Sequence, residues 1–152
     1  MKNYITKHRY IVALVGGGLI SLVPLFMIQA IISLFPSLAP EGLETVSKFF
    51  SGEFGIIQLI MLISIVIVAP VVEELIFRGL LWHIIKKVAT AEVALVATTI
   101  IFAISHIDFL HVIALLPISF FFGWLRYRYD SIKPSIVAHM SNNFVAMMLT
   151  LL

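Results

Sequence analysis

The 152-residue chain contains no cysteine. This absence excludes disulfide bonds, thiolate metal ligands and a cysteine nucleophile. Signatures of other hydrolases are also missing, because the chain has neither the HExxH of zinc metalloproteases nor a G-x-S-x-G around a nucleophilic serine. Its only aspartates are Asp108 and Asp130, so no buried aspartate pair is present for an aspartyl mechanism.

Charge is scarce as well. Charged residues make up 12% of the chain and hydrophobic residues 61%, whereas an ordinary soluble domain has roughly 25% charged residues. A soluble chain of this length buries only about two-thirds of its unfolded surface and could not hide so much apolar area. We therefore expect a lipid bilayer as its surroundings. The net charge of +2 is small and gives no reason to expect a nucleic-acid partner.

Several apolar segments approach the length of a membrane span, which is about 20 helical residues. The first is expected to be a retained helix, because it is long for a signal peptide and no A-x-A-like cleavage site follows. Its Gly16–Gly18 run and Pro24 predict a kink or close helix packing. The sequence thus predicts an all-α, polytopic transmembrane helix bundle of about five spans. These are Ile11–Phe35, Ile56 to about His83, Ala91–Ile107, Phe109–Leu125 and Pro134–Leu152.

Lysine and arginine are concentrated in the connections on one side of these spans. The opposite connection, residues 36–55, contains three glutamates and one lysine. By the positive-inside rule this places the N-terminus inside and the C-terminus outside. We therefore expect a multi-pass protein of a cell membrane, and we interpret this membrane as a bacterial plasma membrane. The basic residues on the inner side are Lys2, Lys7, Arg9, Lys86, Lys87, Arg126, Arg128 and Lys133.

Three of the predicted spans contain polar residues within their apolar runs. A charged side chain there costs about 2.5–3.5 kcal/mol to insert, so such residues are rare and usually functional. At a rise of about 1.5 Å per residue, most of them fall into one layer between the middle and the inner half of the bilayer. The set consists of Glu73, Glu74, Arg78, His106, His139, Asn142 and Asn143.

Helical spacing assigns partners within this set. Glu74 and Arg78 are four residues apart, in the order that favours an ion pair. Glu73 points about 140° away from Arg78, because successive side chains are separated by about 100°, so its carboxylate is left to face other helices. His139 and Asn143 are also four residues apart and share a face.

Such groups support more than one chemistry. A carboxylate and a histidine can activate water as a general base, and histidine with asparagine can donate hydrogen bonds to an oxyanion. Glu73, His106 and His139 could instead hold a divalent metal such as zinc, with a water in the open position. A second candidate metal cluster is His106 with Asp108 and His111, although the latter two lie at the outer boundary.

Each polar residue also has a purely structural interpretation. Glu74 with Arg78 can join helices, and Asn142 or Asn143 can form interhelical hydrogen bonds. The aromatic run Phe120–Trp124 is interpreted as lipid-facing and interfacial.

Around these residues the chain resembles the CAAX-protease and bacteriocin-processing family of membrane endopeptidases, also called the CPBP, Abi or lysostaphin-resistance-protein-like family. That family carries E-E-x-x-x-R, F-x-x-x-H and H-x-x-x-N on successive helices. Here the three motifs are EELIFR (Glu73–Arg78), FAISH (Phe102–His106) and HMSNN (His139–Asn143). On the basis of this resemblance we divide the chain into two parts. Residues 1–54 contain the basic leader, the first helix and the outer loop, and residues 55–152 form a catalytic helical core.

The resemblance implies a hydrolase that cleaves peptide bonds with a water activated between Glu73 and His106. It assigns the oxyanion hole to His139 and Asn143, and the shaping of the site to Glu74 and Arg78. Metal-dependent and glutamate-dependent mechanisms have both been described for the family, so both stay open here. The implied partner is a peptide or membrane-protein substrate, in peptide processing or in self-immunity to a bacteriocin, and an oligomer is compatible with this role.

Two other functions would use the same polar layer. The chain could be a non-enzymatic immunity or partner-binding membrane protein, in which these residues only pack the bundle. It could also be an ion- or proton-translocating subunit. That function needs a polar path to both faces, and the outer halves of the helices supply few polar residues.

Overall fold

A computed structural model describes residues 2–38, 49–50, 54–106 and 109–151. All regular structure in these ranges is helical, which confirms the predicted all-α bundle. One long rod, Ile56–Lys86, consists of α4 (Ile56–Ile63), η2 (Ser64–Val68), α5 (Ala69–Glu74), η3 (Leu75–Leu81) and α6 (Trp82–Lys86). The other elements are α1 (Lys2–Ile20), α2 (Leu22–Leu34), the short η1 (Pro36–Leu38), α7 (Ala91–Ile104), α8 (Phe109–Tyr129) and α9 (Ile132–Leu151).

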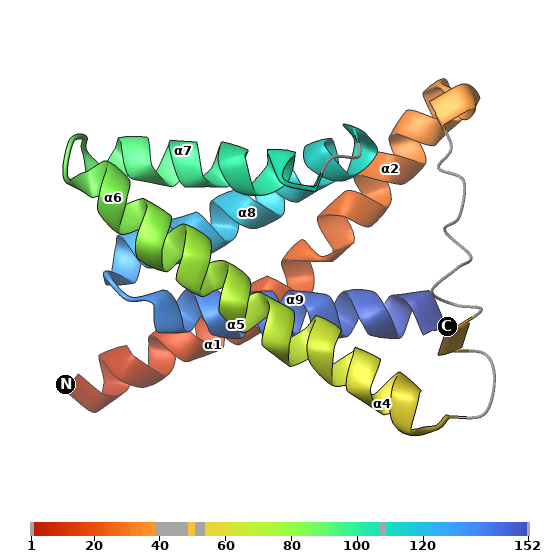
Figure 1. The fold of residues 1–152 in the computed structure, drawn as a ribbon, viewed down its shortest axis with the longest axis horizontal. Helices are drawn as coiled ribbons and strands as arrows, with labels where there is room; N and C mark the ends of the chain where they lie inside the picture. The colour runs from red at the N-terminus through yellow and green to blue at the C-terminus, as the bar shows by residue number, and fades with distance from the viewer. Residues whose placement is uncertain (1, 39–48, 51–53, 107–108, 152) are drawn as a thin grey trace.

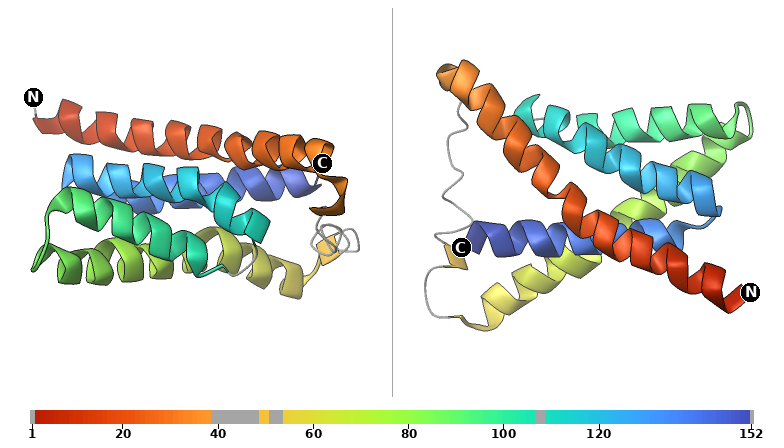
Figure 2. Two further views of the ribbon diagram at one scale, coloured as in Figure 1. Left: turned by 90° about the horizontal axis from the view of Figure 1, so that it is seen from above. Right: turned by 180° about the vertical axis from the view of Figure 1, so that it is seen from behind.

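The helices are stacked in layers. The α1–α2 pair covers one face of the bundle, the Ile56–Lys86 rod lies on the opposite face, and α8 and α9 lie between them (Figure 2). The most extensive contacts are those of α1 with α9 and of α7 with α8. The middle layer thus brings α9, which carries His139, against the rod that carries the two glutamates.

In the part of the chain that the structure describes, three helical segments are long and apolar enough to cross a membrane, namely Lys7–Leu34, Ile56–Lys86 and Phe109–Tyr129. The span predicted for residues 91–107 forms a helix only as far as Ile104, and 14 residues cover about 21 Å, less than the hydrocarbon core. Large apolar side chains cover the outside of the bundle, including Ile57, Ile60 and Ile67 on the rod, which are 63%, 55% and 43% exposed. An apolar exterior of this extent is suited to lipid.

Connections that are rich in basic residues lie at one end of the bundle. Figure 1 shows the N-terminus, the α6–α7 connection and the α8–α9 connection at the left, and the C-terminus with the end of α2 at the right. The sorting of charges read from the sequence therefore corresponds to two physical ends. Which end faces the cell interior stays a prediction.

The turn from α8 to α9 is at the basic end. Asp130 adopts φ 44° there, a left-handed conformation that aspartate tolerates better than most residues. Arg126 donates a 2.7 Å hydrogen bond to its carboxylate, and this bond lowers the pKa of Asp130 below its ordinary value. The turn reverses the chain so that α9 packs back along α8.

The predicted kink in the first span is present, since α1 and α2 are separated at Ser21. The predicted close packing is present too. A Cβ atom at Gly17 would collide with the backbone of Ala138 on α9. At Gly18, by contrast, a Cβ atom would lie 3.3 Å from the Ser141 hydroxyl and 3.4 Å from Val145. Only Gly17 is thus required for the approach of α1 to α9.

We expect Gly17→Ala to lower the free energy of unfolding by about 1–3 kcal/mol, because overpacking against backbone forces the helices apart. Gly18→Ala is the matched control, because there the Ser141 hydroxyl has to shift by only a few tenths of an ångström. Thermal unfolding of the detergent-solubilised variants, followed by tryptophan fluorescence, compares the two. Equal shifts in Tm would contradict the packing described here.

Candidate active site

The local structure around the glutamates follows from Pro70. In a π-helical turn such as η2, each backbone N–H donates to the carbonyl five residues earlier, and the N–H of Ala69 donates to the carbonyl of Ser64. The next hydrogen bond of this pattern would join an N–H at position 70 to the carbonyl of Ile65. Proline has no N–H, and that carbonyl is left to another donor. Nδ2 of Asn143 on α9 donates to it at 2.9 Å. Pro70 therefore creates the acceptor that holds α9 beside the glutamate-bearing rod.

This link predicts a coupling between Pro70 and Asn143. Asn143→Leu should cost about 1–2 kcal/mol of unfolding free energy, because it removes an interhelical hydrogen bond and leaves a carbonyl unsatisfied. In a Pro70→Ala background the cost should be smaller, since the alanine N–H restores a helical donor. Unfolding free energies of the two single variants and the double variant measure the coupling. Additivity within about 0.5 kcal/mol would disprove the link.

The predicted ion pair between Glu74 and Arg78 is present and completely buried. Nη1 of Arg78 donates to Oε1 of Glu74 at 2.9 Å, and both side chains are 0% exposed. Nη2 of Arg78 donates to the carbonyl and the hydroxyl of Ser119 at 2.7 and 2.6 Å. The Ser119 hydroxyl in turn donates to the carbonyl of Thr99 at 3.2 Å. Sequence reasoning missed Ser119, which joins the pair to α8 and α7.

His139 connects this pair to the second carboxylate. Its Nδ1 lies 3.1 Å from Oε1 of Glu74, and its Nε2 lies 3.5 Å from Oε2 of Glu73. The Glu73 side chain is 31% exposed, whereas those of Glu74 and His139 are 0% and 5% exposed. Glu73 is thus the one carboxylate of the network that is open to its surroundings, and it faces α9 rather than Arg78, as its helical position predicts.

The ring of His139 is held by two aromatic residues. It stacks on Phe122 with 4.6 Å between ring centroids and meets the edge of Phe102 at 5.8 Å. Phe122 is 0% exposed, so the prediction that Phe120–Trp124 is a lipid-facing run is wrong at this position. Phe122 and Gly123 of this run are buried, because α8 is the middle helix, with neighbours on more than one side.

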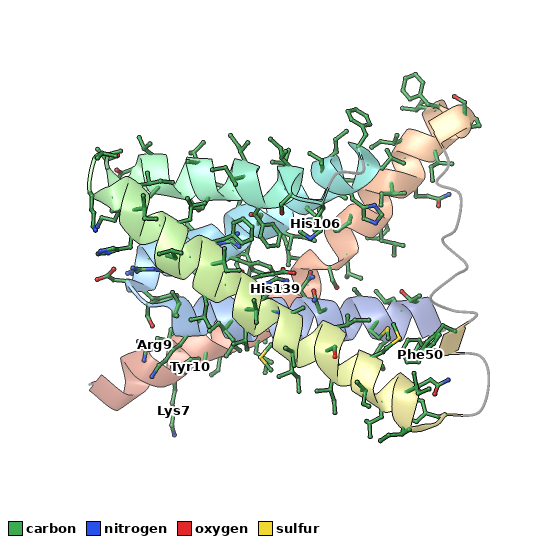
Figure 3. The ribbon with its side chains drawn as sticks, in the orientation of Figure 1. Lys7, Arg9, Tyr10, Phe50, His106 and His139 are labelled. Atoms are coloured by element: carbon green, nitrogen blue, oxygen red, sulfur yellow. The ribbon has the colours of Figure 1, made fainter. Side chains whose placement is uncertain are left out.

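Phe102 lies at the centre of the site. Its ring contacts the Arg78 guanidinium, with 4.7 Å from Cζ to the ring centroid, and His106, with 5.0 Å between ring centroids. The two histidines are therefore grouped around one buried phenylalanine. Figure 3 shows both of them near the middle of the bundle, His106 at the end of α7 and His139 on α9.

His106 has a defined tautomer when its ring is neutral. Its Nδ1 lies 3.0 Å from the carbonyl of Phe102, and a carbonyl can only accept, so the proton of the neutral ring belongs on Nδ1. Nε2 then has the lone pair and can accept a proton or a hydrogen bond. Within the described residues, the ion-pair partner of Glu73 is His139 and not His106.

The residues suggested for a metal do not fit one in this arrangement. Among the described residues, no group of three or more histidine, aspartate and glutamate side chains is arranged to hold a metal ion. Asp108, a member of the second suggested cluster, lies outside the described residues.

Comparison with known proteins gives two matches. Residues 55–145 match the family described as Type II CAAX prenyl endopeptidase Rce1-like. A protein of Bacillus subtilis (strain 168) named "Putative membrane peptidase YdiL" is 32% identical over 110 residues, which are 70% of this chain and 45% of that protein. The chain thus spans less than half the length of this relative. No solved structure is significantly similar.

Proposed function

The chain belongs to the Type II CAAX prenyl endopeptidase Rce1-like family, and on this premise we propose that it is an intramembrane endopeptidase in which Glu73 is the general base. Its substrate would be a peptide or a membrane-protein segment that enters the bundle from the lipid. The setting would be a bacterial plasma membrane, and the role peptide processing or self-immunity to a bacteriocin.

The observation that carries the proposal is the contrast between the two adjacent glutamates. Glu74 is enclosed and bonded to Arg78 at 2.9 Å, so its charge is already compensated. Glu73 is partly exposed, and among the described residues its ion-pair partner is Nε2 of His139, at 3.5 Å. A carboxylate in this position can remove a proton from a water that attacks the carbonyl carbon of a peptide bond.

The surrounding groups would stabilise the tetrahedral intermediate. Its oxyanion would accept hydrogen bonds from Nε2 of a protonated His139 and from Asn143. The amide nitrogen of Asn143 carries two hydrogens, and the bond to Ile65 uses one of them. The proton taken by Glu73 would then pass to the leaving amine. During the attack, the second O–H of this water would donate a hydrogen bond to Nε2 of His106.

Arg78 and Ser119 act here as positioning residues. They fix Glu74, and Glu74 fixes the ring of His139 through Nδ1. With both carboxylates ionised and with Arg78 and His139 protonated, the four side chains carry no net charge. This balance lowers the cost of burying them in an apolar bundle.

The test is cleavage by the purified protein in proteoliposomes that contain synthetic apolar peptides of about 20 residues. Carried out in H₂¹⁸O, the reaction should place one ¹⁸O atom in the new C-terminal carboxylate, because water is the attacking nucleophile. Mass spectrometry of the products detects this label. The absence of any product above protein-free vesicles, from a protein shown to be folded, would favour the non-enzymatic alternative.

A further inference from the structure

A cavity of about 490 Å³ lies between α2, α8 and α9, one helical turn from His139. Its walls are mostly apolar, but four polar residues also line it, namely Ser21, His111, Asn142 and Thr150. This volume is within the range of about 300–1,000 Å³ that is typical of ligand pockets. The lining residues used below are Leu25, Ile28, Ile118, Asn142 and Ala146.

Asn142 gives this cavity a polar group that lacks a partner. The residue is 6% exposed, and its Oδ1 has no hydrogen-bond partner among the described residues. Its Nδ2 donates to Oδ1 of Asn143 at 3.1 Å, so Asn142 is also joined to the proposed oxyanion hole. A buried acceptor without a donor lowers the stability of the fold. A rotation of the Asn142 side chain about χ2 can turn its Oδ1 toward a donor in the cavity.

Position along α9 relates the cavity to the reaction centre. Asn142 is three residues after His139 and so lies on the same face, about 4.5 Å further along the axis. An extended peptide advances about 3.3 Å per residue. A substrate whose scissile bond is at His139 would therefore place a residue one or two positions away beside Asn142.

We propose that this cavity is a side-chain subsite for the substrate of the proposed endopeptidase, which this inference takes as its premise. The cavity takes an apolar side chain one or two residues from the scissile bond. Oδ1 of Asn142 accepts a hydrogen bond from the substrate backbone N–H. A segment unwound for cleavage needs such acceptors, because lipid offers none for a free N–H.

The wall formed by Leu25 and Ile28 on α2 lies outside residues 55–145, the part that matches the family. The packing of Gly17 against Ala138 and a 2.7 Å hydrogen bond from Ser141 to the carbonyl of Leu14 fix α1 on α9. The α1–α2 pair is thus part of the substrate site and sets its size.

The test uses synthetic apolar peptides of about 20 residues that differ at one position near the cleavage site, with Gly, Ala, Leu or Phe. In proteoliposomes, Ala146→Phe should narrow the cavity and shift the preference toward the small side chains. Ile28→Ala should widen it and shift the preference toward the large ones. We expect each shift to be about tenfold in kcat/KM, the effect of one or two methylene groups in an apolar pocket. Asn142→Leu should raise KM for all peptides.

Ala97→Phe is the matched control for Ala146→Phe, because Ala97 lines a separate apolar groove on α7 and should leave the preference unchanged. Unchanged relative rates in both cavity variants, with wild-type cleavage intact, would overturn the subsite. If Ala146→Phe fails to fold, the subsite is tested by Ile28→Ala alone, through its expected shift of preference toward large side chains. Failure of the proposed function would show itself differently, as no cleavage by the wild type.

Discussion

Replacing Glu73 with glutamine should lower the rate of peptide cleavage by about 10²–10⁴-fold, the typical contribution of a general base. Glutamine keeps the size of the side chain but cannot take a proton from water. The fold should be unaffected, because Glu73 is 31% exposed and its ion-pair contact with His139 is long, at 3.5 Å. The measurement is kcat/KM in proteoliposomes, together with the thermal stability of each protein.

Glu92→Gln is the matched control. Glu92 is also a glutamate on a helix, but it lies in the first turn of α7 and accepts a hydrogen bond from Tyr127, away from the site. Its replacement should change the cleavage rate less than twofold or so, within the effect of a surface substitution. Glu73→Gln with wild-type turnover would remove Glu73 from the role of base.

Replacing Arg78 with methionine should lower the free energy of unfolding by about 3–5 kcal/mol, the cost of breaking a buried ion pair. Glu74 would stay at 0% exposure without its cation, and Ser119 would lose two hydrogen bonds. Reversible unfolding in mixed micelles measures the loss. Arg128→Met makes the same change at an exposed position and should cost at most about 0.5 kcal/mol.

The double variant Glu74→Met with Arg78→Met separates the two causes of this loss. Without a buried uncompensated carboxylate it should be more stable than Arg78→Met alone, since apolar residues often replace a buried ion pair at little cost. If the double variant is the less stable protein, the pair contributes through packing and not through charge compensation.

Much of this site could be predicted from helical spacing. The order Glu74, Arg78 predicted their ion pair, and the angle between neighbouring side chains predicted that Glu73 faces another helix. The match over residues 55–145 also confirms the resemblance stated on the three motifs. These predictions succeeded because they depend on positions within one helix or on residues that are conspicuous in an apolar run.

Other parts of the site could not be predicted in this way. Ser119 and Phe122 look like ordinary members of an apolar helix, and only the placement of α8 in the middle layer turns them toward Arg78 and His139. The π-helical turns η2 and η3 also change the register of the rod, which a regular helix pattern does not reveal. For the same reason, the sequence did not reveal that Asn143 would meet the carbonyl of Ile65.

The most direct test of the central claim is a double-mutant cycle between Glu73 and His139, measured as kcat/KM per folded molecule. In the proposed mechanism the two side chains act on one water and one carbonyl group. We therefore expect Glu73→Gln with His139→Gln to be about as slow as the slower single variant, as is found for residues that act as a unit. Independent effects that multiply in the double variant would contradict the account.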